Sequence, residues 1–274
     1  MVELILLFRD ALYGSLVIAV TCGLLGVWVV LRRIVFVGAA LAQLSSAGIA
    51  LALLLAGAGL GLGLATEPLT LALALTLLGA VFFGVGSQRQ LVPPDATIGV
   101  TYAVAGAVGV LLIAKAAAGE AHDLYLHGNI LGLTRQDTWR EVVVAVPVLL
   151  AHAVFYKEFL FVSFDPETAR TQGFRVLRWN LFLYFTIGLV IAFAIQSAGV
   201  LVVFNFLVLP AVTGLLVARG MAGTFLVAGV AAAIAVVGGF VMSVPFDLPT
   251  GSAIIAVSGL LVMLAWVIRR VRGD

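Results

Sequence analysis

Charged residues are scarce in this sequence. Asp, Glu, Lys and Arg make up 10% of its 274 residues, against roughly 25% in a typical soluble domain. Hydrophobic residues account for 63% of the chain, so there are too few charges to cover them with a water-exposed surface. We therefore predict that lipid is the main solvent and that the fold is an all-α polytopic membrane protein. The 30 glycines agree, because small residues let membrane helices pack closely.

Cysteine and net charge are also low. Cys22 is the one cysteine, so no intrachain disulfide can form, and we interpret it as a small packing residue. A net charge of +2 does not predict binding to nucleic acid. The N-terminal residues Glu3, Arg9 and Asp10 do not form a basic leader, which predicts mature sequence and not a removed signal peptide.

The sequence lacks the motifs of ATPases and of intramembrane metalloproteases. It has no G-x-x-x-x-G-K-[ST] phosphate loop and no H-E-x-x-H metalloprotease motif. We find no paired carboxylates within an apolar run that would suit acid–base catalysis. We therefore expect a transport protein and not an enzyme, and any ATP that drives it must be hydrolysed by another subunit.

Nine apolar runs are long enough to cross a bilayer, which takes about 20 residues. They lie at 12–31, 37–57, 68–86, 96–115, 140–160, 179–197, 199–218, 222–243 and 250–268. The two runs that meet at residues 196–199 are nearly continuous. One of them can be a broken or re-entrant helix, and eight crossings is the alternative. We expect residues 1–274 to form a single transmembrane domain.

Basic residues predict the sidedness of the spans. If the C-terminal arginines are cytoplasmic, eleven basic residues lie inside and four lie outside, and the N-terminus lies outside. The inner residues are Arg32, Arg33, Arg89, Lys157, Arg170, Arg175, Arg178, Arg219, Arg269, Arg270 and Arg272. The outer residues are Arg9, Lys115, Arg135 and Arg140.

The longest inner polar segment, residues 156–178, contains the signals that start and end a short helix. The carboxylate of Asp165 can accept the free N–H groups of a first turn, and Pro166 suits the first helical position. Gly173 can adopt the left-handed conformation that ends a helix. The pattern predicts a two-turn helix over about 165–173.

This short helix has two interpretations. It is either an ordinary connector or a coupling helix that transmits movement from a separate ATPase into the membrane. Ala169 and Phe174 are its predicted apolar contacts. The residues predicted to take part in coupling are Asp165, Pro166, Glu167, Ala169, Arg170 and Gly173.

Several segments, in order along the chain, resemble the permeases of metal-importing ATP-binding-cassette systems of the zinc, manganese and iron class. The clearest is FYKEFLFVSFDPETA at 155–169, followed by Gly173, which resembles the family's entry into its coupling helix. The other similar segments are 31–48, 95–99, 103–110, 128–131, 201–215 with Pro210, and 247–251.

The resemblance implies a homodimeric permease in the cytoplasmic membrane of a prokaryote, with the transport path between its two subunits. It also implies a cytoplasmic ATP-binding-cassette ATPase and an extracytoplasmic solute-binding protein as partners. No covalently bound cofactor is expected, because the metal is cargo and ATP binds to the partner subunit. We expect transport by alternating access.

The sequence departs from this family at two positions of the second span. Many members carry an Asp and, four residues later, a His, which would share one helix face. The corresponding residues here are Ala39 and Gln43. The amide oxygen of Gln43 is a weak metal ligand, although it can line a hydrated path. The other candidate residues are His122, Asp123 and His127 in the outer loop, His152 in the fifth span, and Asp247 at an outer gate.

Each of these candidates also has a plainer interpretation. His127 is a metal contact or entry-gate residue, or else a polar residue at the membrane interface. His122 and Asp123 can be solvated loop residues. An ionisable group at membrane depth is costly, so His152 is either functional or a neutral histidine bonded to a neighbouring helix near Pro147. For Asp247 we expect a cap at the N-terminus of the last span.

The sequence thus predicts the permease of an ATP-driven importer for a divalent transition metal, with zinc preferred over manganese and iron. The alternative is an ATP-driven permease for a chelated metal or an organic cofactor, which would not need the missing Asp and His. A secondary transporter would need an ion site near the bilayer midplane, where His152 and Asn205 are the available residues. We expect Asn205 to form a hydrogen bond between helices.

Overall fold

A computed structural model describes residues 8–59, 63, 67–86, 93–116 and 130–272, and all regular structure in these ranges is helical. The chain divides into two compact units, each made of several segments. Unit 1 comprises residues 1–33, 127–145 and 197–274, and unit 2 comprises residues 34–126 and 146–196. The prediction of a single permease domain stays a prediction.

Unit 1 is built around α2, α11 and the second half of α10. Its described elements are α2 (Arg9–Leu31), η2 (Ile130–Gly132), the first part of α7 (Arg135–Val154), α10 (Val176–Val217) from residue 197, α11 (Met221–Phe246) and α12 (Thr250–Arg272). Val27, Ala211 and Ala228 form a buried cluster that joins α2, α10 and α11. Gly26 allows α2 to approach the main chain of α10, because any Cβ there would overlap the carbonyl oxygen of Leu207.

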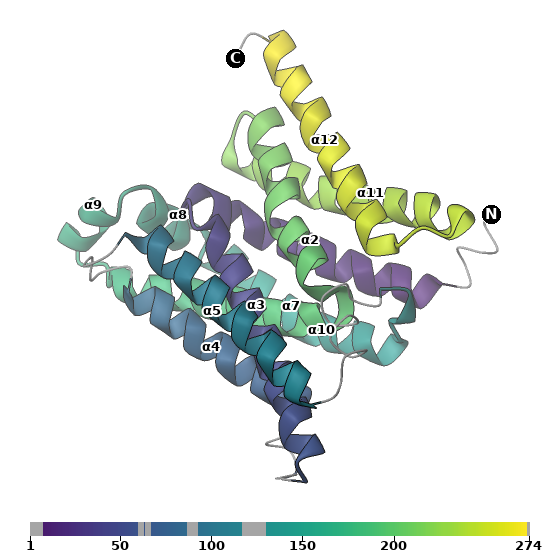
Figure 1. Ribbon diagram of the computed structural model, residues 1–274. Coiled ribbons are helices and arrows are strands. Elements are labelled where there is room, and N and C mark those ends of the chain that lie inside the picture. The colour runs from purple at the N-terminus through teal and green to yellow at the C-terminus, as the bar shows by residue number, and fades with distance from the viewer. Residues whose placement is uncertain (1–7, 60–62, 64–66, 87–92, 117–129, 273–274) are drawn as a thin grey trace. The chain divides into compact units, whose positions relative to one another are not determined.

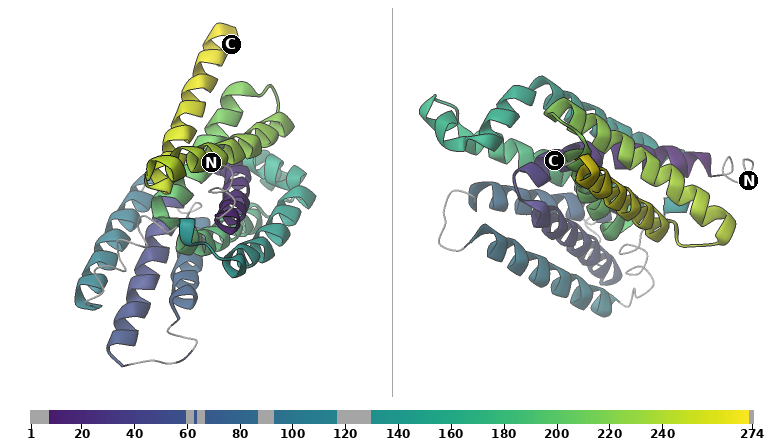
Figure 2. Two further views of the ribbon diagram at one scale, coloured as in Figure 1. Left: turned by 90° about the vertical axis from the view of Figure 1, so that its right-hand side faces the viewer. Right: turned by 90° about the horizontal axis from the view of Figure 1, so that it is seen from above.

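Unit 2 contains a group of three long helices, in which α3 packs against both α4 and α5. These helices lie side by side in Figure 1 and in both views of Figure 2. The elements of unit 2 are α3 (Val35–Gly57), α4 (Pro68–Gly86), α5 (Pro94–Ala116), the end of α7, α8 (Tyr156–Phe164), α9 (Pro166–Thr171) and the first half of α10. Gly48 brings α3 close to the main chain of α4, at Leu71 and Ala72.

The helices confirm the prediction of an all-α membrane protein with eight or nine spans. Within the described residues, seven helices are long and apolar enough to cross a membrane, and the bent pair α7–α8 is an eighth candidate. The 42 residues of α10 would measure about 63 Å as one straight helix, roughly twice the hydrocarbon thickness of a bilayer. Its backbone breaks at Gly199, with φ 78° and ψ 164°, which is where the sequence predicted the junction. Dividing α10 there gives the ninth span.

The predicted span 140–160 is wrong as a continuous helix. The chain bends by 69° between α7 and α8, and Phe155 lies at the bend. Aromatic packing stabilises the bend: the Phe155 ring lies 5.3 Å from that of Trp179, and the Phe159 ring lies 5.6 Å from that of Phe182. These contacts come from α10, so the local sequence does not reveal them.

Large apolar side chains cover much of the exposed surface of the helices. Leu111 is 67% exposed, Leu226 70% and Leu264 59%. In water such a surface would be unfavourable, whereas in a bilayer it contacts acyl chains and the helical backbone is satisfied internally. The exposed apolar side chains therefore agree with lipid as the solvent.

Candidate functional site

The predicted inner helix is present as α9, and its N-terminus is capped as the sequence indicates. The side chain of Asp165 accepts a hydrogen bond from the backbone N–H of Thr168, with 3.0 Å between Oδ1 and N, and Pro166 is the first helical residue. Hydrogen bonding from Thr168 lowers the pKa of the Asp165 carboxyl. The carboxylate therefore remains charged at neutral pH and complements the positive end of the helix.

The C-terminus of α9 is a Schellman motif centred on Gly173, which has φ 87°. The Phe174 N–H donates to the Ala169 carbonyl at 3.0 Å, and the Gly173 N–H donates to the Arg170 carbonyl at 3.1 Å. Ala169 is fully buried in a cluster with Val162 and Val176, against which Phe174 packs. Both apolar contacts predicted for this helix are thus confirmed.

Ala169 anchors helix α9 to the protein, and the polar side chains of the helix point to solvent. Ala169 is buried, whereas Asp165, Pro166, Glu167 and Arg170 are exposed. A rigid two-turn helix held at both ends and presenting charged side chains suits docking to a soluble partner. The coupling role of these residues stays a prediction.

His152 is buried within unit 2 and bonded to a neighbouring helix. Its Nε2 lies 2.9 Å from the hydroxyl of Thr186 on α10, and its ring stacks on Phe159 at 4.5 Å with 6° between the planes. The side chain is 6% exposed. This geometry agrees with the interpretation of His152 as a hydrogen-bonded histidine that links α7, α8 and α10.

Replacing His152 separates its two interpretations. The change His152→Phe keeps an aromatic ring on Phe159 and removes the hydrogen bond to Thr186, so we expect a loss of about 1 kcal/mol in unfolding free energy and normal metal uptake. The change His152→Ala leaves a cavity and should cost about 3 kcal/mol. Thermal unfolding in detergent and uptake in cells measure the two effects. A stable but inactive His152→Phe protein would show that the imidazole itself is functional.

Gln43 faces α5 within unit 2. It is half-buried on α3, and a Cβ added to Gly106 would lie 3.4 Å from its Oε1. Ala39, one turn earlier, is 8% exposed. The helix face that carries Asp and His in many members of the resembled family therefore offers one amide here.

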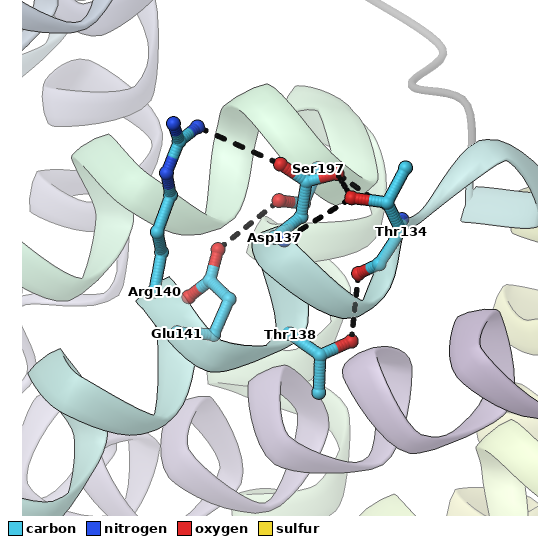
Figure 3. Close-up of polar contacts among 6 residues, drawn as sticks. All are labelled: Thr134, Asp137, Thr138, Arg140, Glu141 and Ser197. Atoms are coloured by element: carbon cyan, nitrogen blue, oxygen red, sulfur yellow. Dashed lines mark hydrogen bonds and ion pairs between the residues drawn. The ribbon is translucent and has the colours of Figure 1, made fainter.

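A carboxylate that is not among the candidates predicted from the sequence lies at the start of α7. Glu141 is 5% exposed, and its Oε1 accepts a hydrogen bond from the Ser197 hydroxyl at 3.1 Å. Figure 3 shows both residues in the α7 polar cluster, which consists of Thr134, Asp137, Thr138, Arg140, Glu141 and Ser197. Among the described residues no cation lies within ion-pair distance of Glu141. Ser197 is two residues before the break at Gly199.

The other carboxylate of this cluster is already engaged. Asp137 Oδ2 accepts hydrogen bonds from the Thr134 N–H at 3.1 Å and from the Thr134 hydroxyl at 2.6 Å, and the Asp137 N–H donates back to that hydroxyl at 3.3 Å. This reciprocal pair caps α7. Arg140 lies 3.7 Å from Asp137. Asp137 is therefore engaged in capping α7, whereas the partner given for the Glu141 carboxylate is the Ser197 hydroxyl.

The remaining candidates are the outer-loop residues and Asp247. His122, Asp123 and His127 lie outside the described residues. Asp247 ends α11 in a left-handed conformation, with φ 52° and ψ 41°, so the prediction that it caps α12 is wrong. The Ser243 hydroxyl instead joins the start of α12, with 2.5 Å to the Thr250 hydroxyl.

Asn205 bonds between helices as predicted. Its side-chain N–H group donates to the Ser258 hydroxyl on α12 at 3.1 Å, within unit 1. Asn205 is 3% exposed and Ser258 is 2% exposed. Across the described ranges, no three His, Cys, Asp or Glu side chains come together as a metal site.

Comparison with known proteins gives consistent matches over nearly the whole chain. The profile of the ABC 3 transport family matches residues 5–269. The manganese transport system membrane protein MntC of Listeria innocua is 29% identical over 268 residues, covering 94% of this chain and 89% of that protein. A probable iron transport system membrane protein of Haemophilus influenzae is 25% identical and covers 96% of this chain and 94% of its own length.

A solved structure shares the fold. The structure of PsaBC from Streptococcus pneumoniae in complex with Fab superposes with a TM-score of 0.80 at 25% sequence identity. The alignment covers 94% of this chain and 90% of the matched chain. The likeness therefore extends over nearly the whole chain.

Proposed function

The chain belongs to the ABC 3 transport family, and from this membership we propose that it is the membrane-spanning permease of an ATP-driven manganese importer. The observation that carries the proposal is the family match over residues 5–269 together with a relative named for manganese transport. Iron is the second candidate, since another relative is named for probable iron transport. Neither of these relatives is named for zinc, so the preference for zinc has no support from them.

The donor atoms in the described helices favour manganese over zinc. Unit 1 offers the Glu141 carboxylate and the Ser197 hydroxyl, and unit 2 separately offers the Gln43 amide oxygen. Carboxylate and carbonyl oxygens suit Mn²⁺. Imidazole suits zinc, and His152 is the one histidine among the described residues. Oxygen donors in a hydrated path would bind the ion weakly enough for release.

We place Glu141 near the point of metal entry. It follows Arg135 and Arg140, which the basic-residue pattern assigns to the outer side. A buried carboxylate at this end of α7 can replace part of the hydration shell of an arriving cation. Ser197 holds one carboxylate oxygen in position, next to the break in α10.

The proposed assembly contains three further components. Two copies of the permease form a homodimer in the cytoplasmic membrane, a binding protein delivers metal outside, and an ATP-binding-cassette ATPase docks on α9 inside. The chain has no phosphate loop of its own, so the ATPase must be a separate subunit. Closure of the ATPases would move α9 and switch the path between outward and inward access.

The identity of the metal can be tested in cells that lack their own importers for manganese, zinc and iron. We expect the complete system to restore uptake of radioactive Mn²⁺, with competition by unlabelled Mn²⁺ much stronger than by Zn²⁺. Uptake of a metal chelate without uptake of the free ion would support the chelate permease instead. Uptake that continues without ATP would support a secondary transporter.

Glu141 provides a test of the proposed path. The change Glu141→Gln preserves size and removes the charge, so we expect the Mn²⁺ concentration for half-maximal uptake to rise about tenfold. Asp137→Asn is the matched control, because Asp137 is engaged by Thr134, and it should change uptake little. Equal uptake by the parent and the Glu141→Gln protein would remove Glu141 from the path.

A further inference from the structure

A groove opens beside the C-terminal end of α9, within unit 2. It has a volume of about 560 Å³ and includes Gly173. The residues of the groove that matter here are Phe155, Phe174, Arg175, Arg178, Trp179 and Phe182. The groove thus combines an aromatic wall with two arginines.

The aromatic wall is continuous and partly open. Phe155 lies 5.3 Å from Trp179 and 6.1 Å from Phe182, measured between ring centroids. The Phe155 side chain is 38% exposed, although it lies beside two other aromatic rings. A surface of this kind is stabilised by contact with an apolar chain.

The arginines lie where a positive charge is unfavourable. Arg175 immediately precedes α10, Arg178 is in its first turn, and that turn contains no acidic residue. The positive end of the helix dipole repels both side chains. Within the part of the chain that the structure describes, neither arginine has a carboxylate within ion-pair distance, and no residue that lines the groove is acidic. A bound anion would neutralise the arginines and the helix end together.

The predicted sidedness places the groove at the inner membrane surface. Arg170, Arg175 and Arg178 are among the basic residues assigned to the cytoplasm. At this depth, phosphate headgroups lie above acyl chains, and aromatic rings such as that of Trp179 are favoured. Basic pockets on this side attract anionic lipids.

We propose that the groove binds an anionic phospholipid of the inner leaflet. Its phosphate contacts Arg175 and Arg178, and one acyl chain lies along Phe155, Trp179 and Phe182. An acidic segment of the ATPase would also match the arginines, but it would leave the aromatic wall without a function. The two parts of the groove together match a molecule with an anionic head and an apolar tail.

The proposal can be tested by quenching of Trp179 fluorescence with brominated lipids. The other tryptophans are first removed with Trp28→Phe, Trp139→Phe and Trp266→Phe. The protein is placed in vesicles of equal parts phosphatidylglycerol and phosphatidylcholine, with bromine on one lipid or on the other. We expect quenching to show an enrichment of phosphatidylglycerol at Trp179 of about five- to tenfold.

The double change Arg175→Gln and Arg178→Gln should abolish this enrichment, while quenching by brominated phosphatidylcholine persists and shows that the groove is intact. The matched control, Arg219→Gln with Arg269→Gln, removes two exposed arginines elsewhere and should retain the enrichment. Equal quenching by the two labelled lipids in the parent would overturn the proposal. Unchanged enrichment in the Arg175→Gln/Arg178→Gln protein would do the same. Loss of ATPase binding in lipid-free detergent, with unchanged lipid quenching, would assign the groove to the ATPase.

Discussion

Replacing Gly173 by valine is expected to uncouple the permease from its ATPase. Gly173 has φ 87°, and a left-handed conformation costs an ordinary residue about 1–2 kcal/mol, with a β-branched residue the worst case. The Schellman hydrogen bonds that hold Phe174 and Ala169 together would be lost. We expect the amount of ATPase that co-purifies with the permease to fall about tenfold, since 1.4 kcal/mol corresponds to that factor. The rate of metal uptake should fall by a similar factor.

The matched variant is Gly173→Asn. Asparagine tolerates the left-handed conformation better than other non-glycine residues, and open space surrounds this position. Gly173→Asn should therefore retain most of the ATPase binding and uptake that Gly173→Val loses. If both variants assemble and transport like the parent, the docking role of α9 is wrong.

The second large effect is expected at Gly26, where α2 packs against the main chain of α10 within unit 1. Any side chain there would overlap the carbonyl oxygen of Leu207, and a main-chain atom cannot move aside as a side chain can. We expect Gly26→Val to lower the free energy of unfolding by about 3 kcal/mol or more. This is a large part of the stability of a typical domain, so the yield of folded protein from membranes should fall sharply.

Gly259→Val is the control for this prediction. Gly259 lies inside α12, and a Cβ there would meet open space, so the substitution adds the same side chain to a helix without a clash. Yield and thermal unfolding in detergent compare the two proteins. Equal stability of the two variants would show that the close approach of α2 to α10 is unimportant.

The sequence predicts those parts of the fold that depend on local chemistry. Apolar runs located the spans because each must be long enough to cross the bilayer. Helix α9 was predictable because its start and end are determined by residues within it, from Asp165 to Gly173. The break in α10 was marked by a glycine, and Gly199 has the positive φ that favours this residue.

Features that depend on distant contacts were not predictable in the same way. The partner of His152 is Thr186, which is 34 residues away, and the bend at Phe155 depends on rings from α10. Glu141 lay inside a predicted span, and its charge there was a usable signal, but only the fold brings it to Ser197. Aspartate is a residue type that often caps the N-terminus of a helix. Asp247 nevertheless lies at the C-terminal end of α11.

Transport by purified components in proteoliposomes shows whether this permease is driven by a separate ATPase. The permease is reconstituted with its ATPase and binding protein, and Mn²⁺ accumulation is followed with ATP, without ATP, and with the ATPase omitted. We expect accumulation only in the complete system with ATP, and little accumulation with the Gly173→Val permease. Full accumulation by the permease without an ATPase would contradict this expectation.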